Sequence, residues 1–150
     1  LDGKEVSWLP SYGPEMRGGT CNCSVVISDE SIGSPLVTAP DVLIAMNLPS
    51  LDKFEDSVVP GGTILLDSSL IDRKVTRQDV KVCYVDASRL AEENNMKGSA
   101  NIILVGKMFK ELGFCTEESL YKAVDKCVPP KKAALIEVNK NALKLGYSVE

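Results

Sequence analysis

The sequence predicts an α/β fold, in which a largely parallel sheet is flanked by helices within a single domain. Residues 42–46 form a continuous apolar run, which is typical of a strand buried on both faces of a parallel sheet, and residues 63–66 read as a second buried strand. After residue 86 the apolar side chains change to the spacing of helices. A chain of 150 residues can bury one sizeable core, and its short connections argue against two domains.

Three more strands complete the expected sheet. Residues 6–9 read as a short strand that leads into a loop over residues 10–19, and residues 81–85 read as a third buried strand. In residues 20–28 every second position forms one apolar side, namely Cys21, Cys23, Val25 and Ile27. We expect that side to face the core, and the strand to pair antiparallel at one side of the sheet.

Helices are expected around these strands. Residues 49–56 read as a short helix, and residues 87–95 as another with Asp86 as its N-cap. One helix face is then formed by Ala100, Ile103, Leu104, Met108 and Leu112. We expect Gly113 to end that helix and Thr116 to cap the next one.

The last helix should follow Pro129 and Pro130, with the basic pair Lys131 and Lys132 at its start. Its apolar stripe consists of Ala134, Val138, Ala142 and Leu145. We expect Gly146 to end this helix, because glycine is common just after a helix C-terminus.

Composition excludes several classes of function. The net charge of −4 argues against a nucleic-acid partner, which would require clustered Lys and Arg. No apolar run approaches the ~20 residues of a membrane span, and no signal peptide is visible. With 5 cysteines and no CxxC spacing, a disulfide framework or zinc site is not indicated, and reduced thiols fit the cytoplasm. With 0 histidines, the chain cannot supply a Ser-His-Asp or Cys-His arrangement.

The segment before the strand at 20–28 is rich in glycine yet carries functional side chains. It presents Tyr12, Glu15 and Arg17, followed by Gly18 and Gly19. A bidentate arginine contact with a carboxylate or phosphate is stronger than an exposed ion pair. We therefore expect these five residues to contact a ligand or another subunit. The alternative is that they only shape the loop, with the glycines as a hinge.

Polar residues follow the predicted parallel strands. Asn47, Asp67 and Asp86 each come just after a strand, where open α/β sheets collect ligands. We retain Asn47 as a candidate contact residue. The competing interpretation is that all three cap helices and close turns. A metal site from Asp67 and Asp86 is not favoured, because no further ligands lie at a suitable spacing.

Cys21 and Cys23 invite an iron–sulfur interpretation. Cluster binding needs four thiolates in motif spacing, whereas the other cysteines are scattered singly. Cysteine also serves as a small hydrophobic residue, and we expect these two to fill the core.

The stretch Tyr12-Gly-Pro-Glu-Met-Arg-Gly-Gly-Thr20 resembles the signature of the gamma subunit of 2-oxoacid:acceptor (ferredoxin) oxidoreductases. The resemblance continues through Ile27-Ser-Asp-Glu-Ser-Ile-Gly-Ser-Pro35, Leu43-Ile-Ala-Met-Asn47, Pro60-Gly-Gly-Thr-Ile-Leu-Leu-Asp67 and Asn139-Lys-Asn-Ala-Leu-Lys-Leu-Gly146. Family members open with a strand and a Gly-x-Gly-Gly-Gln-Gly turn, which nothing here matches. The chain begins at Leu1, so we expect that an N-terminal piece is missing.

The resemblance implies a gamma-type domain over residues 1–150 of a multi-subunit enzyme. Such an enzyme oxidatively decarboxylates a 2-oxoacid with coenzyme A, forms an acyl-CoA and reduces ferredoxin. Thiamine diphosphate and iron–sulfur clusters belong to other subunits, so this chain alone should bind no cofactor and show no activity. Its implied partners are the alpha, beta and ferredoxin-like subunits, or a second copy of itself when isolated. Pyruvate, 2-oxoglutarate, branched-chain acids and aryl pyruvates all stay open as substrates.

Two other functions stay open from the residues themselves. One is a purely structural assembly subunit that uses residues 12–19 as an interface. The other is a stand-alone nucleotide-binding or regulatory α/β module, which a GxGxxG turn would support and which this sequence lacks.

Overall fold

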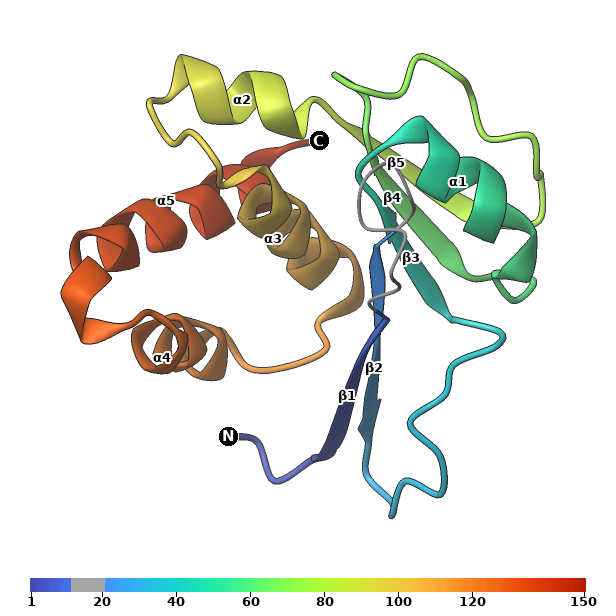
Figure 1. Ribbon diagram of the computed structural model, residues 1–150, viewed down its shortest axis with the longest axis horizontal. Coiled ribbons are helices and arrows are strands. Elements are labelled where there is room, and N and C mark those ends of the chain that lie inside the picture. Colours follow the sequence, from blue (N-terminus) through green and yellow to red (C-terminus); the bar gives the residue numbers. More distant parts are fainter. Residues whose placement is uncertain (12–20) are drawn as a thin grey trace.

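The computed structural model describes residues 1–11 and 21–150. The helices and strands follow in the order β1 (Glu5–Ser11), β2 (Asn22–Ser28), β3 (Val42–Ala45), α1 (Leu48–Phe54), the 3-10 turn η1 (Glu55–Ser57), β4 (Thr63–Asp67), β5 (Lys81–Val85), α2 (Ala87–Glu93), α3 (Ala100–Leu112), α4 (Glu117–Cys127), the 3-10 turn η2 (Pro130–Lys132) and α5 (Ala134–Ser148). Figure 1 shows them forming an α/β domain.

The central sheet is parallel, as the apolar runs predict. Its strands lie in the order β3-β4-β5. Val42 pairs with Thr63, and Thr63 pairs in turn with Lys81. Every residue of the middle strand β4 is buried, because a strand between two neighbours is covered on both faces and both edges. The predicted α/β class with a parallel sheet and flanking helices is confirmed.

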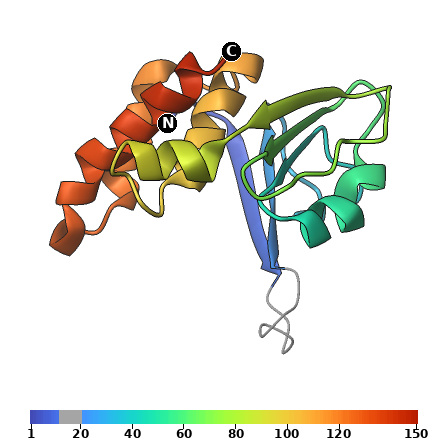
Figure 2. The ribbon, with the colours of Figure 1, turned by 90° about the horizontal axis from the view of Figure 1, so that it is seen from above.

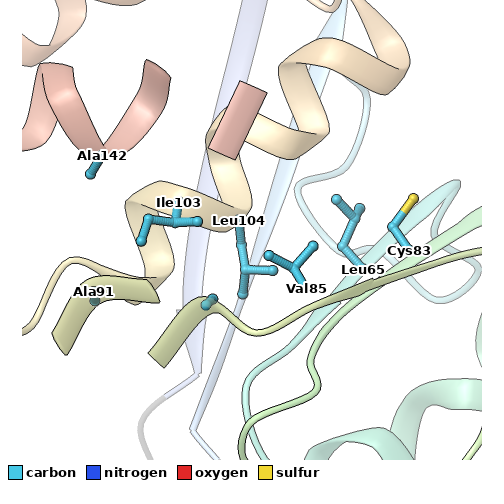
Figure 3. Packing of buried hydrophobic residues seen from close by; sticks show 8 residues of the cluster. Leu65, Cys83, Val85, Ala91, Ile103, Leu104 and Ala142 are labelled. Carbon is cyan, nitrogen blue, oxygen red and sulfur yellow. The ribbon is translucent and has the colours of Figure 1, made fainter. Parts of the chain in front are cut away.

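Helices cover both faces of this sheet (Figures 1 and 2). On one face Ile64 and Leu66 of β4 pack against Leu51 of α1. On the other face Leu65 and Val85 belong to a cluster that includes Leu104 of α3 (Figure 3). Successive side chains of β4 therefore point into two different apolar cores, one on each face of the sheet.

Two glycines bring α3 and α5 into direct backbone contact. A Cβ added at Gly106 of α3 would stand 2.2 Å from the carbonyl oxygen of Leu143, and one at Gly146 of α5 would stand 1.9 Å from that of Ile103. The sequence-based interpretation of Gly146 as a helix stop was wrong, because α5 continues to Ser148. Gly146 is needed for a close helix crossing.

Strands β1 and β2 form a separate two-stranded antiparallel ribbon. Seven residue pairs join them, from Glu5 with Ser28 to Ser11 with Asn22. The antiparallel prediction for residues 20–28 is correct, but the partner is β1 rather than an edge of the parallel sheet. β1 also runs past residue 9 and includes Pro10, which an edge strand tolerates.

The expected inward side of β2 in fact faces solvent. Cys21 and Cys23 are exposed, so the prediction that they fill the core was wrong. Asn22 and Ser24 are half-buried instead. The period of two was read correctly, but periodicity does not say which side of a ribbon meets the protein.

Helix ends largely follow the predictions. Gly113 ends α3 in the left-handed region at φ 56°, and the Thr116 side chain accepts a hydrogen bond from the Ser119 N–H at the start of α4. The carboxylate of Asp2 also accepts from the Thr116 N–H at 2.9 Å, which ties the N-terminal segment to α4. Within residues 1–11 and 21–150, none of the helices has the length and hydrophobicity that crossing a bilayer requires.

Candidate functional site

The polar residues at the carboxyl ends of the parallel strands are engaged in the fold. Asn47 follows β3, and its side-chain oxygen accepts a hydrogen bond from the Ser50 N–H at 2.9 Å. This bond caps α1, which begins one residue later. The capping interpretation of Asn47 therefore has direct support, while its role as a contact residue stays a prediction.

Asp67 is the most deeply buried polar residue of this edge. It is fully buried at the end of β4. Its Oδ2 accepts from the Ser88 hydroxyl at 2.6 Å and from the Ser88 N–H at 3.1 Å, and Oδ1 accepts from the Ser69 N–H at 3.1 Å. A buried carboxylate must have such donors, since leaving it unpaired is costly.

Asp86 lies beside Asp67 in the same network. The Ser68 hydroxyl donates to its Oδ1 at 2.5 Å, and the Arg89 guanidinium pairs with its Oδ2. The Ser68 hydrogen bond, followed by the Arg89 contacts, holds the pKa of Asp86 below its ordinary value despite the opposing effect of burial. The structure thus brings Asp67 and Asp86 together through Ser68 and Ser88.

This network joins the loop after β4 to the start of α2. A backbone hydrogen bond joins the same two segments, since the Ser68 N–H donates to the Val85 carbonyl at 2.9 Å. Both carboxylates already accept several hydrogen bonds. These bonds favour a structural role for Asp67 and Asp86 over ligand binding. Across the described part of the chain, no three His, Cys, Asp or Glu side chains are grouped to hold a metal ion.

A second buried carboxylate, Glu55, was missed by sequence reasoning. It accepts from the Thr76 N–H at 2.6 Å and from the Arg73 guanidinium at 2.7 Å. Burial acts to raise the pKa of Glu55, but the hydrogen bonds from Arg73 and Thr76 lower it overall. Glu55 anchors the segment between β4 and β5 against η1. Its partners lie about twenty residues away in the chain, so no local pattern indicates them.

A cavity of about 260 Å³ between α3, α4 and α5 was also not foreseen. Its lining includes Tyr121, Lys144 and Tyr147. The Lys144 ammonium lies 5.9 Å from the centre of the Tyr121 ring. Burial, and after it the neighbouring Glu117 carboxylate, raises the pKa of Tyr121. These side chains come from separate helices, so only the tertiary fold gathers them.

The candidate contact residues Tyr12, Glu15, Arg17, Gly18 and Gly19 lie outside the described residues. The strands on either side of them are described: β1 ends at Ser11 and β2 begins at Asn22. The contact role of these five residues stays a prediction.

Comparison with known proteins identifies the family. The family described as Pyruvate ferredoxin/flavodoxin oxidoreductase matches residues 1–149. The chain belongs to this family. The resemblance noted from the motifs is therefore confirmed over nearly the whole chain.

Two similar proteins are named as enzyme subunits. The chain is 42% identical over 147 residues to "Ketoisovalerate oxidoreductase subunit VorA" of Methanothermobacter thermautotrophicus, covering 97% of this chain and 30% of that protein. It is 36% identical to "2-oxoglutarate synthase subunit KorC" of Methanocaldococcus jannaschii, covering 99% of this chain and 79% of that protein. The chain thus spans less than a third of VorA but most of KorC.

The fold agrees with a solved gamma subunit. The keto/oxoacid ferredoxin oxidoreductase gamma subunit from Geobacter sulfurreducens PCA superposes with a TM-score of 0.80 at 31% identity, covering 97% of this chain and 80% of that one. The α/β domain described above is therefore the fold of that subunit.

Proposed function

We propose that this chain is the gamma subunit, or the gamma-type domain, of a 2-oxoacid:ferredoxin oxidoreductase. The observation that carries this proposal is the likeness to the Geobacter gamma subunit, which extends over 97% of the chain. The match to KorC over 79% of that protein supports the same assignment. The whole enzyme would convert a 2-oxoacid and coenzyme A into an acyl-CoA and carbon dioxide, and pass the electrons to ferredoxin.

In this proposal the chain is an accessory component. It has 0 histidines, and the carboxylates Asp67, Asp86 and Glu55 are used up in internal hydrogen bonds. Within the described residues, the two carboxylates at the sheet edge where ligands usually collect, Asp67 and Asp86, are therefore already hydrogen-bonded. Chemistry on the 2-oxoacid then belongs to the alpha and beta subunits.

An iron–sulfur cluster does not fit the described residues. An iron–sulfur cluster needs several thiolates in one place. Cys83 is buried in the sheet while Cys127 is exposed at the end of α4, and no three potential ligands are grouped within residues 1–11 and 21–150. We therefore assign the clusters to the partner subunits, and we assign thiamine diphosphate to them as well, as the family resemblance implies. Reduced cysteines and a ferredoxin partner suit the cytoplasm.

We further propose that Arg17 and its neighbours act on the coenzyme A side of the reaction or at a subunit contact. A guanidinium can hold a phosphate or a carboxylate bidentately. The purely structural assembly subunit remains the second candidate, and the saturated network around Asp67 favours it over a stand-alone nucleotide-binding module.

Reconstitution tests the proposal. The chain is combined with candidate alpha, beta and ferredoxin-like subunits, and gel filtration reports whether one complex forms. Reduction of ferredoxin is then followed with pyruvate, 2-oxoglutarate and 2-oxoisovalerate, because the relatives are named for different acids. Assembly with acid- and coenzyme A-dependent reduction supports the proposal. A complex that reaches full rate without the chain refutes the accessory role.

A further inference from the structure

Helix α4 is packed into the domain more loosely than the helices beside it. None of its 11 residues is buried, whereas α3 and α5 each bury several of theirs. The two apolar cores of the described chain contain no residue of α4. Figure 1 shows α4 at the outer end of the helical layer, away from the parallel sheet. The helix therefore adds little to the packing that stabilises the domain.

Two cavities weaken the contact between α4 and its neighbours. The cavity of about 260 Å³ described above lies on one side, and a second cavity of about 370 Å³ is lined by Val124 of α4 and Val105 of α3. Leu120 of α4 and Leu143 of α5 line both cavities, so neither side chain is fully surrounded by protein atoms. Side chains beside a cavity lose the dispersion contacts that a close neighbour would supply. The apolar side of α4 is therefore weakly held.

Polar contacts attach α4 near its two ends. At its start, the Asp2 carboxylate accepts hydrogen bonds from the Thr116 N–H at 2.9 Å, from the Thr116 hydroxyl at 3.2 Å and from the Ser119 hydroxyl. Toward its end, Asp125 pairs with Lys140 of α5 at 2.7 Å. Asp125 is 47% exposed, and a solvated ion pair of this kind contributes little. The three bonds to the Asp2 carboxylate are therefore the larger of the two attachments.

The attachment at Asp2 comes from a distant part of the chain. Asp2 lies 114 residues before Thr116, and β1 begins three residues after it at Glu5. The chain itself joins α4 to α3 through Gly113, whose φ of 56° only glycine adopts readily, and to α5 through residues 128–133. Short connections of this kind can absorb the rotation of a helix. The position of the segment before β1 therefore decides whether α4 is held at its start.

We propose that α4 opens from α3 and α5 as one unit while the rest of the domain stays folded, and that Asp2 is the latch that keeps it closed. Proteins open locally in cooperative units, and units with few buried apolar contacts open most readily. Opening uncovers Leu143 of α5 and Val105 of α3, which line the cavities beneath α4. Withdrawal of Asp2 releases α4, so the latch couples the segment before β1 to the exposure of this apolar surface.

Amide hydrogen exchange of the lone chain tests this proposal without any other subunit. We expect the amides of α4 to exchange at least about tenfold faster than those in the middle of α3 and α5, because they need only the local opening. Low concentrations of denaturant are then added. The exchange of α3 and α5 should accelerate more steeply than that of α4, since opening one helix exposes less surface than unfolding the domain.

Three variants test the latch and the cavity separately. Asp2→Ala removes the acceptor of the three bonds, and we expect it to speed exchange in α4 by at least about threefold while α3 and α5 keep their rates. Asp29→Ala is the matched control, because Asp29 is an exposed carboxylate that pairs with Lys4. Ala123→Leu adds a side chain in the second cavity, which Ala123 lines, and should slow exchange in α4.

Each outcome decides one part of the proposal. Faster exchange in α4 for Asp2→Ala, with slower exchange for Ala123→Leu, supports both the opening and the latch. Equal rates for α3, α4 and α5 with one common dependence on denaturant would show that α4 opens only with the whole domain, which overturns the proposal. If Asp2→Ala exchanges as Asp29→Ala does, Asp2 is not a latch. None of these results bears on the proposed function, because the lone chain is measured.

Discussion

Gly106 of α3 faces the carbonyl oxygen of Leu143 in α5 at a distance that excludes a side chain, since a Cβ there would stand 2.2 Å from that oxygen. Gly146 makes the reciprocal approach to Ile103. The pair of glycines allows the two helices to lie against each other while α3 also covers the parallel sheet.

Gly106→Ala and Gly146→Ala should each destabilise the protein by about 1–3 kcal/mol, because the clash is with backbone that cannot rotate away. Alanine would otherwise favour a helix by about 1 kcal/mol, so a loss of stability reports the close contact itself. Chemical unfolding of the lone chain measures it.

Gly33→Ala serves as the control, because nothing lies within 4 Å of a Cβ at that position. Alanine variants at Gly106 and Gly146 that are as stable as Gly33→Ala would contradict the crossing described here.

We expect Glu111 to make the stability of the folded protein depend on pH in the acid range. Hydrogen bonds from Lys107 and then Lys81 lower the pKa of Glu111 from 4.5 to about 2. Because the folded-state pKa is depressed, the stabilisation is present above pH 4.5 and disappears as the pH falls toward 2. The shift bounds the effect at about 3 kcal/mol.

The variant Glu111→Gln should therefore lose stability at neutral pH and show a flatter pH dependence between pH 5 and pH 2. Lys107 adds to the loss, because its side chain is only 5% exposed and would keep a buried charge without its carboxylate. Glu118→Gln is the comparison, since Glu118 pairs with Lys122 but is 75% exposed. Equal pH profiles for the two variants would refute this account of Glu111.

Asp67→Ala should destabilise the lone chain by about 1–3 kcal/mol, because it removes the acceptor of the Ser88 and Ser69 bonds. If Asp67 is structural, the assembled variant should keep the wild-type KM for coenzyme A and for the 2-oxoacid. Thermal unfolding of the chain and steady-state kinetics of the complex are compared. A stable variant that has lost turnover would instead make Asp67 a functional residue.

Arg17→Ala tests the residues between β1 and β2. We predict that the lone chain unfolds as the wild type does, within about ±0.5 kcal/mol. Loss of a charged hydrogen bond should cost the complex about 1.5–3 kcal/mol, which is a tenfold to hundredfold effect on coenzyme A use or subunit affinity. Wild-type behaviour in both assays would remove Arg17 from the site, and simple unfolding would make it a structural residue.

Sequence reasoning succeeded where local chemistry determines structure. The apolar run at 63–66 predicted β4, and Gly113 and Thr116 were predicted as helix ends from their own conformational and capping preferences. It failed where a neighbour distant in the chain decides. The exposed side of Cys23 depends on how the ribbon meets the protein, and the position of Gly146 inside α5 depends on its contact with Ile103.

In the candidate site too, local features were predictable from the sequence and contacts between distant residues were not. Asn47, Asp67 and Asp86 were expected just after strands, and all three lie at the carboxyl ends of strands: Asp86 follows β5 directly, Asn47 comes two residues after β3, and Asp67 is the last residue of β4. The bond from Ser50 to Asn47 is the helix cap that the competing interpretation expected, but the Ser88 partner of Asp67 and the Ser68 partner of Asp86 were not predicted. A serine twenty residues away gives no periodic signal, so the sequence could not show that these carboxylates are already satisfied.

The measurement that tests the central claim most directly is ferredoxin reduction by the reconstituted enzyme with and without this chain. The alpha, beta and ferredoxin-like subunits are assayed with the 2-oxoacid and coenzyme A, first alone and then with the chain added. We predict that the chain alone shows no turnover and that the other subunits reach full coenzyme A-dependent rate only in its presence. Turnover by the isolated chain, or a full rate in its absence, would contradict its assignment as a gamma subunit.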